Sequence, residues 1–547
     1  MTSSHAYIPD QATIAEIDRI FHGLVAERKA PAYTYGIFDR NGLIHCGHGG
    51  AVGRVDRPGT PVELGEHTRF RIASMSKSFA AAAVMQLAAE GRIDLHAPAA
   101  SVVPQLANVR PYSSDAFEIT IHDLLAMSSG LATDDAWADR QEPISRAELQ
   151  SLLSQRLRTI FNPGERYEYS NIGYAAIGEA IRNVSGMDVP EYVRLHLLEP
   201  LELHETTYDY REVDPALLAQ GYHLDPTAGD GPADSAGAGW VPEPFSAPGA
   251  FSVIGGVISS VHDMAIWDAW LARGFDSDGE PLPGDDVLPR RYRRLMQMPH
   301  TPAPPVLRSG SSRGWLTKRD FNEIEAYGYG LIVKHDERFG DVAYHSGGYP
   351  GYGSNMRWHL DSGLGVVVLA DGRYATPSVL AIRALSLLLE QAGRDGSVAG
   401  WSFRLWDETR EAQRRVNVML AGLAESAGTE TAGADACTQA IESLSDLLAM
   451  NVTMDWTMPE RGTQLAKLLA VTGRPILHDG AVTASAPHAD SPAQLSWTVA
   501  CERHPMRCTI QLNSLEHPQV QTLEFTRADA PRTDDIVTVT PGTRILD

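Results

Sequence analysis

The sequence predicts an α/β (α+β) protein: an antiparallel sheet flanked by helices, with an all-helical lobe inserted and a small C-terminal α+β domain. Two observations predict this architecture. The predicted elements run in the order helix, hairpin, helical block, strands and a last helix. The composition then changes at residues 390–400, which indicates a linker between a domain of residues 1–395 and a domain of residues 400–547.

The first domain begins with an amphipathic helix and a hairpin. Apolar residues recur on one helical face over residues 11–28. Residues 33–38 and 43–46 are β-prone runs, and Asn41-Gly42 between them is typical of a hairpin turn. We therefore expect two paired strands directly after the first helix.

A helical block and a set of strands follow. A helix is predicted over residues 74–90, and further helix signals over residues 120–200 place the helical lobe at roughly residues 100–215. Strands are predicted at residues 329–333, 343–344, 354–359 and 364–369, with a helix at residues 379–391. Residues 224–250 and 299–313, rich in Pro, Gly, Ala and Ser, are predicted to be surface loops.

The second domain combines helices with an antiparallel sheet. Helices are predicted at residues 403–424 and 438–448, and short alternating runs predict strands at residues 495–500, 509–512 and 520–525.

The composition excludes several classes of partner. The net charge of −23 repels polyanions, so no nucleic-acid partner is expected. No apolar run approaches the ~20 residues that a membrane span needs, so no membrane partner is expected either. The first ten residues lack a signal-peptide pattern, which predicts a cytoplasmic protein whose four cysteines are free thiols.

The first chemistry-bearing motif is Ser74-Met75-Ser76-Lys77. Residues i and i+3 share a helix face, so the Ser74 hydroxyl and the Lys77 amine can meet. A serine is a poor nucleophile until a base removes its proton, and a partly desolvated lysine amine can accept or relay that proton. Taken alone, the motif also fits a capping serine followed by a surface lysine.

The second motif is Tyr169-Ser170-Asn171, where a loop enters a predicted helix. A tyrosine beside an ammonium group can act as a base or proton shuttle, and an asparagine amide can orient a substrate amide. Taken alone, an aromatic core residue followed by a helix cap is the better interpretation.

The third motif is His345-Ser346-Gly347, followed by Gly348, after a predicted strand. His345 and Gly347 should face one side of that strand and Ser346 the other. The backbone N–H of Gly348 can pair with that of Ser74 to stabilise an oxyanion. A strand followed by a tight glycine turn is the alternative.

The three motifs, in this order, resemble the serine β-lactamase and penicillin-binding-protein superfamily, and most closely its class C β-lactamases, D-aminopeptidases and family VIII-like esterases. The resemblance covers roughly residues 10–395, and three supporting segments match: Leu124–Leu131, Gly255–Asp263 and Tyr327–Leu331. Met127 stands where the family usually has a histidine, and His345 stands where many members have a lysine.

The resemblance implies a serine hydrolase in which Ser74 is the acylated nucleophile. Lys77 and Tyr169 would share proton transfer, with the choice of base left open. Asn171, His345, Ser346, Gly347 and Gly348 would bind the substrate. The implied substrate is a small molecule or short peptide, and no cofactor or metal ion is expected.

Three activities stay open within this family. The first is a D-stereospecific amidase or aminopeptidase-like peptidase, and the second is a carboxylesterase or weak β-lactamase. The third is a non-catalytic penicillin-binding-like module. The resemblance places His345 on the leaving-group side, and because histidine ordinarily titrates near ~6.5, His345 is expected to titrate there. The alternative is that His345 only packs against the neighbouring strand.

Several weaker patterns concern possible metal ligands, substrate contacts and the role of the C-terminal residues. His45 and His48 are not expected to bind a metal ion. Asp134, Asp135 and Asp139 are read as a solvated loop in preference to a pocket rim, and Tyr349 and Tyr352 as residues that could stack on a substrate. Residues 400–547 carry no spacing that acyl transfer requires, so an accessory role is expected: a lid, a pocket wall or a homo-oligomer contact.

Overall fold

The computed structural model forms two compact units, Met1–Gly396 and Ser397–Asp547. Their boundary lies inside the predicted linker of residues 390–400. The structure describes residues 7–54, 56, 60–225, 239–276, 281–303, 306–308, 321–336, 338–393, 399–426, 431–529 and 542–546. The predicted loops at 224–250 and 299–313 therefore lie partly outside the described residues.

The first unit is built on a nine-stranded sheet with the order β2-β1-β13-β12-β11-β10-β9-β7, and β8 also pairs with β9. Neighbouring strands are antiparallel. The strands are β1 (Ala32–Asp39), β2 (Gly42–Gly50), β7 (Thr301–Pro302), β8 (Val306–Arg308), β9 (Phe321–Tyr327), β10 (Ile332–Asp336), β11 (Gly340–Tyr349), β12 (Tyr352–His359) and β13 (Gly365–Ala370). Two short pairs lie outside this sheet: β3 (Phe70–Arg71) with β6 (Ile258–Ser259), and β4 (Tyr222–Leu224) with β5 (Trp240–Pro242).

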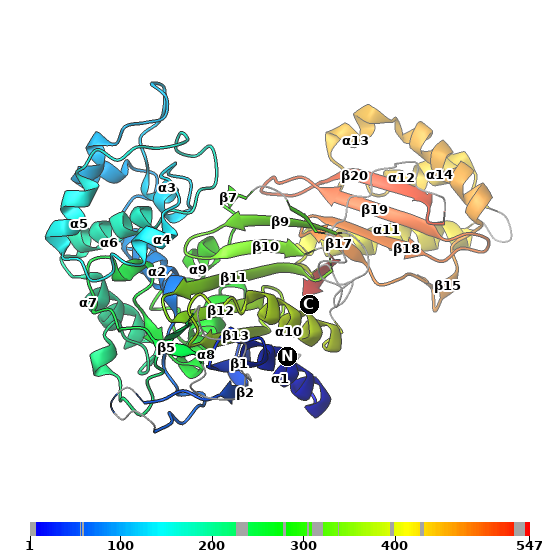
Figure 1. Cartoon of the computed structure of the whole chain (residues 1–547). Coiled ribbons are helices and arrows are strands. Elements are labelled where there is room, and N and C mark those ends of the chain that lie inside the picture. Colours follow the sequence, from blue (N-terminus) through cyan, green and yellow to red (C-terminus); the bar gives the residue numbers. More distant parts are fainter. Residues whose placement is uncertain are drawn as a thin grey trace. The chain divides into compact units, whose positions relative to one another are not determined.

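Helices cover both faces of the sheet and form a separate lobe (Figure 1). The α-helices are α1 (Gln11–Ala26), α2 (Lys77–Ala89), α3 (Ile121–Leu125), α4 (Asp135–Ala138), α5 (Arg146–Leu153), α6 (Asn171–Ser185), α7 (Val189–Val193), α8 (Val261–Ala272), α9 (Arg290–Met296) and α10 (Ser378–Gln391). Shorter 3₁₀ turns are η1 (Ala73–Ser76), η2 (Ala99–Ser101), η3 (Pro104–Asn108), η5 (Tyr210–Glu212), η6 (Ser252–Ile254) and η7 (Arg273–Phe275), and η4 (Arg194–Leu198) is a π turn. The lobe is made of α3 to α7 and includes the Tyr169 motif.

The hydrophobic sequence of β13 follows from its two buried faces. Successive side chains of a strand point to opposite sides. Val366 and Val368 pack with α1 and α10, whereas Val367 and Leu369 belong to the core that includes α8. A strand covered by helices on both faces has no solvent side, so it is apolar at every position rather than at alternate ones.

Two predicted elements differ from the structure near the first motif. The predicted helix at residues 74–90 begins as the 3₁₀ turn η1 before α2. The strand predicted at residues 329–333 is correct only at residues 332 and 333, where β10 begins, because a turn at residues 328–331 joins β9 to β10. Gly330 has φ +68°, and a Cβ atom on it would lie 2.5 Å from the carbonyl oxygen of Lys77. This turn therefore packs directly on the start of α2.

The second unit has its own core and its own sheet, with the order β17-β18-β19-β20. Its helices are α11 (Asp407–Ser426), α12 (Ala434–Glu442), α13 (Met450–Asp455) and α14 (Met458–Thr472). Its strands are β14 (Ala399–Arg404), β15 (Leu477–His478), β16 (Ala481–Val482), β17 (His488–Ser491), β18 (Gln494–Val499), β19 (Met506–Leu512), β20 (Val520–Arg527) and β21 (Gly542–Leu546). The prediction missed α14, and it placed the start of the first helix inside β14.

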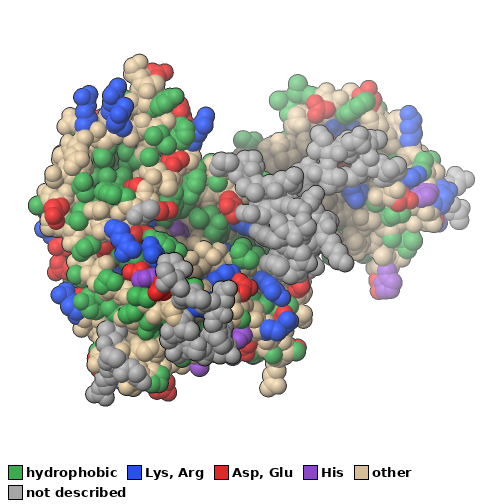
Figure 2. Space-filling view, in the orientation of Figure 1, with side chains coloured by type: hydrophobic (Ala, Val, Ile, Leu, Met, Phe, Trp, Pro, Cys, Tyr) green, Lys and Arg blue, Asp and Glu red, His purple; other side chains and the backbone are tan. Residues whose placement is uncertain are grey.

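Surface and composition features are simple. None of the helices in the described part of the chain has the length and apolar character needed to cross a bilayer. The four cysteines are free thiols, as predicted. Figure 2 shows one face of the molecule, on which acidic and basic side chains are interspersed over the described residues.

Because each unit has a separate core, residues 397–547 expressed alone should fold. Trp497, which is 2% exposed, reports on this core by fluorescence. We expect one cooperative urea transition for residues 397–547. A matched chain of residues 431–547 lacks α11, which supplies Val416 and Leu420 to the core, and should not show this transition. A gradual, non-cooperative change in residues 397–547 would contradict the division.

Candidate active site

Ser74 is the one accessible residue in a long buried stretch. It lies in η1, and every other residue from Phe70 to Leu87 is buried. The residue before it, Ala73, has φ +51°, a left-handed conformation that is unfavourable for a residue with a Cβ atom. The backbone thus turns sharply to present the Ser74 hydroxyl at the surface, while the residues that follow enter the core.

Lys77 lies beneath Ser74 with no exposed surface. Its Nζ donates hydrogen bonds to Ser74 Oγ at 3.1 Å and to the carbonyl oxygen of Ile254 at 2.8 Å. Burial removes water from the ammonium group and lowers the pKa of Lys77 to about 8, although nearby aspartates oppose this shift. The neutral amine is therefore well populated at mildly alkaline pH.

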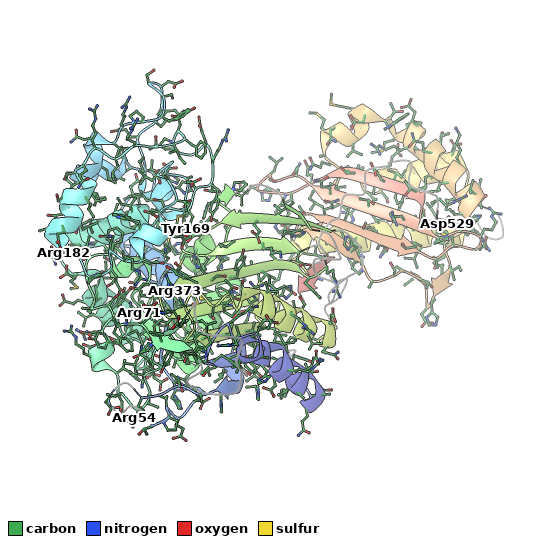
Figure 3. All side chains as sticks on the ribbon, in the orientation of Figure 1. Arg54, Arg71, Tyr169, Arg182, Arg373 and Asp529 are labelled. Atoms are coloured by element: carbon green, nitrogen blue, oxygen red, sulfur yellow. The ribbon has the colours of Figure 1, made fainter. Side chains whose placement is uncertain are left out.

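Tyr169 completes a cluster around these two residues. Figure 3 labels its position in the first unit. The Lys77 Nζ lies 4.9 Å from the centre of the Tyr169 ring and 5.7 Å from that of Tyr174. Burial raises the pKa of Tyr169 well above its ordinary value, although a hydrogen bond with Ser74 opposes the rise. The phenol is thus protonated under conditions in which Lys77 loses its proton.

Strand β11 brings the third motif against η1. A Cβ atom on Gly347 would lie 2.4 Å from the carbonyl oxygen of Ile72 and 3.0 Å from the Cβ of Ala73, so only glycine fits there. Ser354, opposite Gly347 on β12, donates to the same Ile72 oxygen at 2.7 Å. Ser346 and Gly348 are partly exposed on the strand, whereas His345 and Gly347 are buried, as the predicted alternation requires.

The expected titration of His345 is wrong. Its side chain is 2% exposed, its Nδ1 donates to the carbonyl oxygen of Ser346 at 2.7 Å, and its Nε2 accepts from the Tyr327 hydroxyl at 3.0 Å. Burial, together with the charge of Lys77, lowers the pKa of His345 to about 3. The imidazole is therefore neutral, and its two nitrogens are engaged inside the protein, whereas the sequence suggested a contact with the leaving group.

The prediction that the three aspartates form a solvated loop holds only for Asp135, which is exposed, whereas Asp134 is half-buried and Asp139 is buried. Asp134 accepts from the backbone N–H groups of Asn171 and Ile172, at 2.7 and 2.9 Å, and so caps α6. Asp135 Oδ1 accepts from the Asn171 side-chain amide at 2.6 Å. Asp139 is buried and accepts from the Tyr374 hydroxyl at 2.7 Å.

These carboxylates also act on the charge of the site. All three favour the charged form of Lys77. Burial raises the pKa of Asp139 to about 6, so this group is mostly ionised at neutral pH. Asp135 is exposed, so it presents negative charge to solvent next to Asn171. Asp134, Asp135 and Asp139 therefore place negative charge beside the Ser74 cluster.

A buried ion pair, which the sequence analysis missed, holds the segment before Ser74. Arg71 Nη1 donates to Glu142 Oε1 and Oε2 at 2.6 and 2.7 Å, and both side chains are 1% exposed. Tyr349 donates to Glu142, and Tyr352 donates to the carbonyl oxygen of Ala219. The two tyrosines are thus buried structural residues, which contradicts the stacking role suggested for them. No local spacing signals a pair so far apart in sequence.

The supporting segments contact the same site. Met127, which replaces the family's usual histidine, has its sulfur 3.2 Å from the backbone nitrogen of Ser170. The Gly255–Asp263 segment follows Ile254, whose carbonyl oxygen receives the Lys77 hydrogen bond. The structure therefore brings Ser74, Lys77 and Tyr169 together, and Asn171 is hydrogen-bonded to Asp134 and Asp135, whose charges act on Lys77.

Several known proteins are similar to this chain in sequence. A family model described as Beta-lactamase matches residues 17–390. The chain is similar to Protein flp of Staphylococcus aureus (strain MW2), with 26% identity over 341 residues that cover 61% of this chain and 58% of that protein. It is also similar to Penicillin-binding protein 4* of Bacillus subtilis (strain 168), with 23% identity over 339 residues that cover 60% of this chain and 65% of that protein. The chain thus spans less than two thirds of the length of these relatives.

Two solved structures are similar in fold. One is an octameric penicillin-binding protein homologue from Pyrococcus abyssi, with a TM-score of 0.54, 19% identity, and coverage of 94% of this chain and 99% of that one. The other is a D-stereospecific amidohydrolase from Streptomyces sp., with a TM-score of 0.50, 22% identity, and coverage of 69% of this chain and 98% of that one. At these identities the likeness concerns the fold alone.

Because the pKa of Lys77 is lowered, the free energy of unfolding should depend on pH. Between pH 8 and 10.5 the unfolded chain binds the Lys77 proton more than the folded chain does, so this group makes stability rise with pH. The difference between the ordinary lysine pKa of 10.5 and the folded-state pKa of about 8 corresponds to a free energy of about 3 kcal/mol. Relative to Lys77→Met, the wild type should gain up to this free energy of unfolding over the window, as measured by urea denaturation.

The matched control is Lys467→Met, because Lys467 is exposed. Its stability should run parallel to that of the wild type over the same pH range. If the Lys77→Met and wild-type curves also ran parallel, the pKa of Lys77 would be ordinary.

Proposed function

The chain belongs to the beta-lactamase family, and on that premise we propose that it is a serine hydrolase working through an acyl-enzyme on Ser74. The family match confirms the predicted superfamily, and the solved structures confirm the predicted fold class. The observation that carries the proposal is the contact of 3.1 Å between the accessible Ser74 hydroxyl and the buried Lys77 amine. Within this family the proposed activity is that of a D-stereospecific amidase or aminopeptidase-like peptidase.

The proposed base is Lys77 rather than Tyr169. A base must be deprotonated near the working pH. The pKa of Lys77 is lowered to about 8, whereas that of Tyr169 is raised well above its ordinary value. Lys77 is therefore the group that can accept the Ser74 proton, and Tyr169 is the group that can donate one.

In the proposed reaction, the neutral Lys77 amine accepts the Ser74 proton while Ser74 Oγ bonds to the substrate carbonyl carbon. The N–H groups of Ser74 and Gly348 stabilise the resulting oxyanion. When the bond to the leaving nitrogen breaks, the Tyr169 hydroxyl gives that nitrogen a proton and regains one from the Lys77 ammonium. Water then hydrolyses the acyl-enzyme with Lys77 again as base.

The substrate class rests on charge. A substrate with a free α-amine is cationic, and the carboxylates of Asp134, Asp135 and Asp139 attract a cation. His345 is neutral, so it does not provide the fixed positive charge that anchors a carboxylate. Both features favour D-amino-acid amides or short peptides over penicillins. An ester could form the same acyl-enzyme, so esterase activity is the second candidate.

We propose an accessory role for the second unit, Ser397–Asp547, because the residues of the proposed reaction all lie in the first unit. The Pyrococcus abyssi homologue is octameric, and we propose that this chain also forms a homo-oligomer. No cofactor takes part in the proposed reaction.

Ser74→Ala should abolish hydrolysis without unfolding the protein, because Ser74 supplies a covalent bond rather than packing. Intact-mass spectrometry should show a fluorophosphonate adduct on the wild type and none on Ser74→Ala. Ser78→Ala is the matched control, since Ser78 lies in α2 directly after η1 and is buried, and it should still be labelled. Labelling of Ser74→Ala would assign the nucleophile elsewhere.

If Lys77 is the base, its ionisation sets how kcat/KM depends on pH. Because Lys77 must be neutral, kcat/KM for an uncharged ester should rise with pH through about 8 and then level off. Tyr169→Phe should lower the rate by orders of magnitude while keeping this ionisation. A rate that falls as pH rises through the same range would mean that the charged form of Lys77 is the active one.

Asp135→Asn should reduce the preference for a free amine, because it removes a charge while keeping an oxygen for the Asn171 amide. The readout is kcat/KM for a D-amino-acid p-nitroanilide divided by that for its N-acetyl analogue. The ratio should fall about tenfold or more, the range for a hydrogen bond to a charged group. Asp188→Asn, at a side chain that is 69% exposed, is the control. An unchanged ratio in Asp135→Asn would exclude this amine contact.

A further inference from the structure

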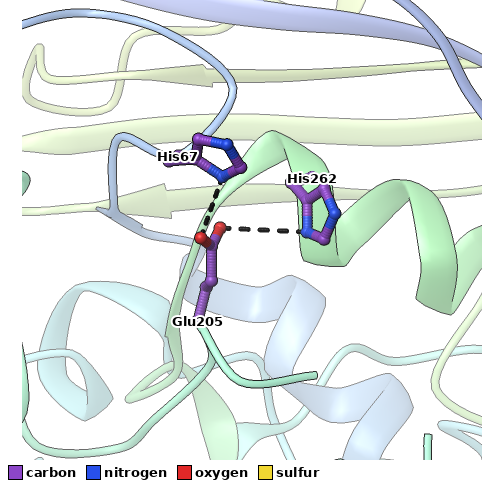
Figure 4. Close-up of side chains that lie close together, drawn as sticks. All are labelled: His67, Glu205 and His262. Atoms are coloured by element: carbon purple, nitrogen blue, oxygen red, sulfur yellow. Dashed lines mark ion pairs between the residues drawn. The ribbon is translucent and has the colours of Figure 1, made fainter. Parts of the chain in front are cut away.

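Three side chains outside the Ser74 cluster converge on one point of the first unit (Figure 4). His67 precedes β3, Glu205 follows the helical lobe, and His262 lies in the first turn of α8. His67 Nδ1 lies 2.9 Å from Glu205 Oε1, and His262 Nδ1 lies 3.9 Å from Glu205 Oε2. One ligand atom from each of the three residues lies within 4.8 Å of the others.

We propose that His67, Glu205 and His262 bind a divalent transition-metal ion of the zinc type. Two imidazoles and one carboxylate are a common ligand set for zinc, with a fourth position open to water. Magnesium and calcium prefer oxygen ligands, so this set favours zinc and its neighbours over them.

The surrounding residues hold these ligands in place. Glu66 Oε1 lies 3.3 Å from His67 Nε2, on the side of the ring opposite Glu205. A carboxylate on the second nitrogen of a metal-binding histidine is a usual feature of such sites, because it fixes the ring and its tautomer. Ser260 donates to Glu205 Oε2 at 2.5 Å, and Asp263 accepts from the Glu205 backbone nitrogen at 2.7 Å.

The local charge favours a divalent cation. Glu66 and Asp263 lie beside the two imidazoles, at 3.3 and 3.1 Å, and Glu205 lies between them. Arg69 opposes binding, because its Nη2 lies 3.6 Å from Glu205 Oε1. Three carboxylates against one guanidinium still leave these groups with two negative charges.

The cluster is open to solvent. The side chains of His67 and His262 are 50% and 39% exposed, so an ion can reach them. Glu205 also lines a cavity of about 850 Å³ with Arg69 and Thr206. Neither the Ser74 cluster nor the two histidines line this cavity, and none of the three proposed ligands takes part in the proposed acyl transfer.

A bound ion would connect three segments that support Ser74. His67 lies just before β3, which pairs with β6 and leads into η1, and His262 follows β6 at the start of α8. Metal binding should therefore stabilise the first unit. The proposed role is structural and goes beyond the proposed hydrolase function.

The test uses the full chain after removal of metal ions with a chelator. Zinc binding is measured by competition with a chromophoric chelator, and ligation by the visible spectrum of Co²⁺ in place of zinc. The wild type should bind one equivalent of zinc at this site, and its Tm should rise with zinc but not with equal Mg²⁺ or Ca²⁺. His67→Ala and His262→Ala should each weaken binding by at least about tenfold and lose the Tm shift.

The matched control is His478→Ala, in the second unit, whose side chain is 84% exposed. This variant should bind zinc like the wild type. Equal zinc affinity in the wild type and in a variant lacking both His67 and His262 would overturn the proposal, as would a wild type that binds no zinc. Substrate is absent from these measurements, so their outcome is independent of the proposed hydrolase.

Discussion

The burial of the Lys77 ammonium is the constraint on which the rest of the site depends. A charged amine without exposed surface is costly unless hydrogen bonds and nearby charge compensate for the lost water. Here Ser74 and the Ile254 carbonyl accept its hydrogen bonds, two tyrosine rings lie beside it, and three aspartates supply negative charge. The compensation is incomplete, so the pKa falls to about 8. That incomplete compensation is what makes the lysine a usable base.

The position of Ser74 depends on the packing of β11 against η1. Ser74 reaches the surface because the backbone turns at Ala73, and this turn is held by the close approach of Gly347 and by the Ser354 hydrogen bond to Ile72. The Arg71–Glu142 pair fixes the residues just before the turn to the helical lobe. Lobe and sheet therefore meet at Ser74, and Tyr169 enters from the lobe side.

The sequence predicted the features that depend on local spacing. The hairpin, the sheet strands β11 to β13, and the meeting of Ser74 with Lys77 follow from periodicity and from an i, i+3 spacing. It did not predict the properties that depend on burial. His345 looks like a titrating group in the sequence, yet burial and the charge of Lys77 lower its pKa and keep it neutral. The roles of Asp135 and Asp139 depend on contacts with Asn171 and Tyr374, which no local pattern encodes. The same limit applies to His67, Glu205 and His262.

The most direct test of this account is the pKa of Lys77 itself. NMR of the full chain with ¹³C-labelled lysine, titrated from neutral to alkaline pH, gives one signal per lysine, and the signal missing in Lys77→Met identifies Lys77. The account predicts a midpoint of about 8 for that signal. A midpoint at or above the ordinary value of 10.5 would contradict it, because Lys77 would then be a permanent cation and could not act as the base for Ser74.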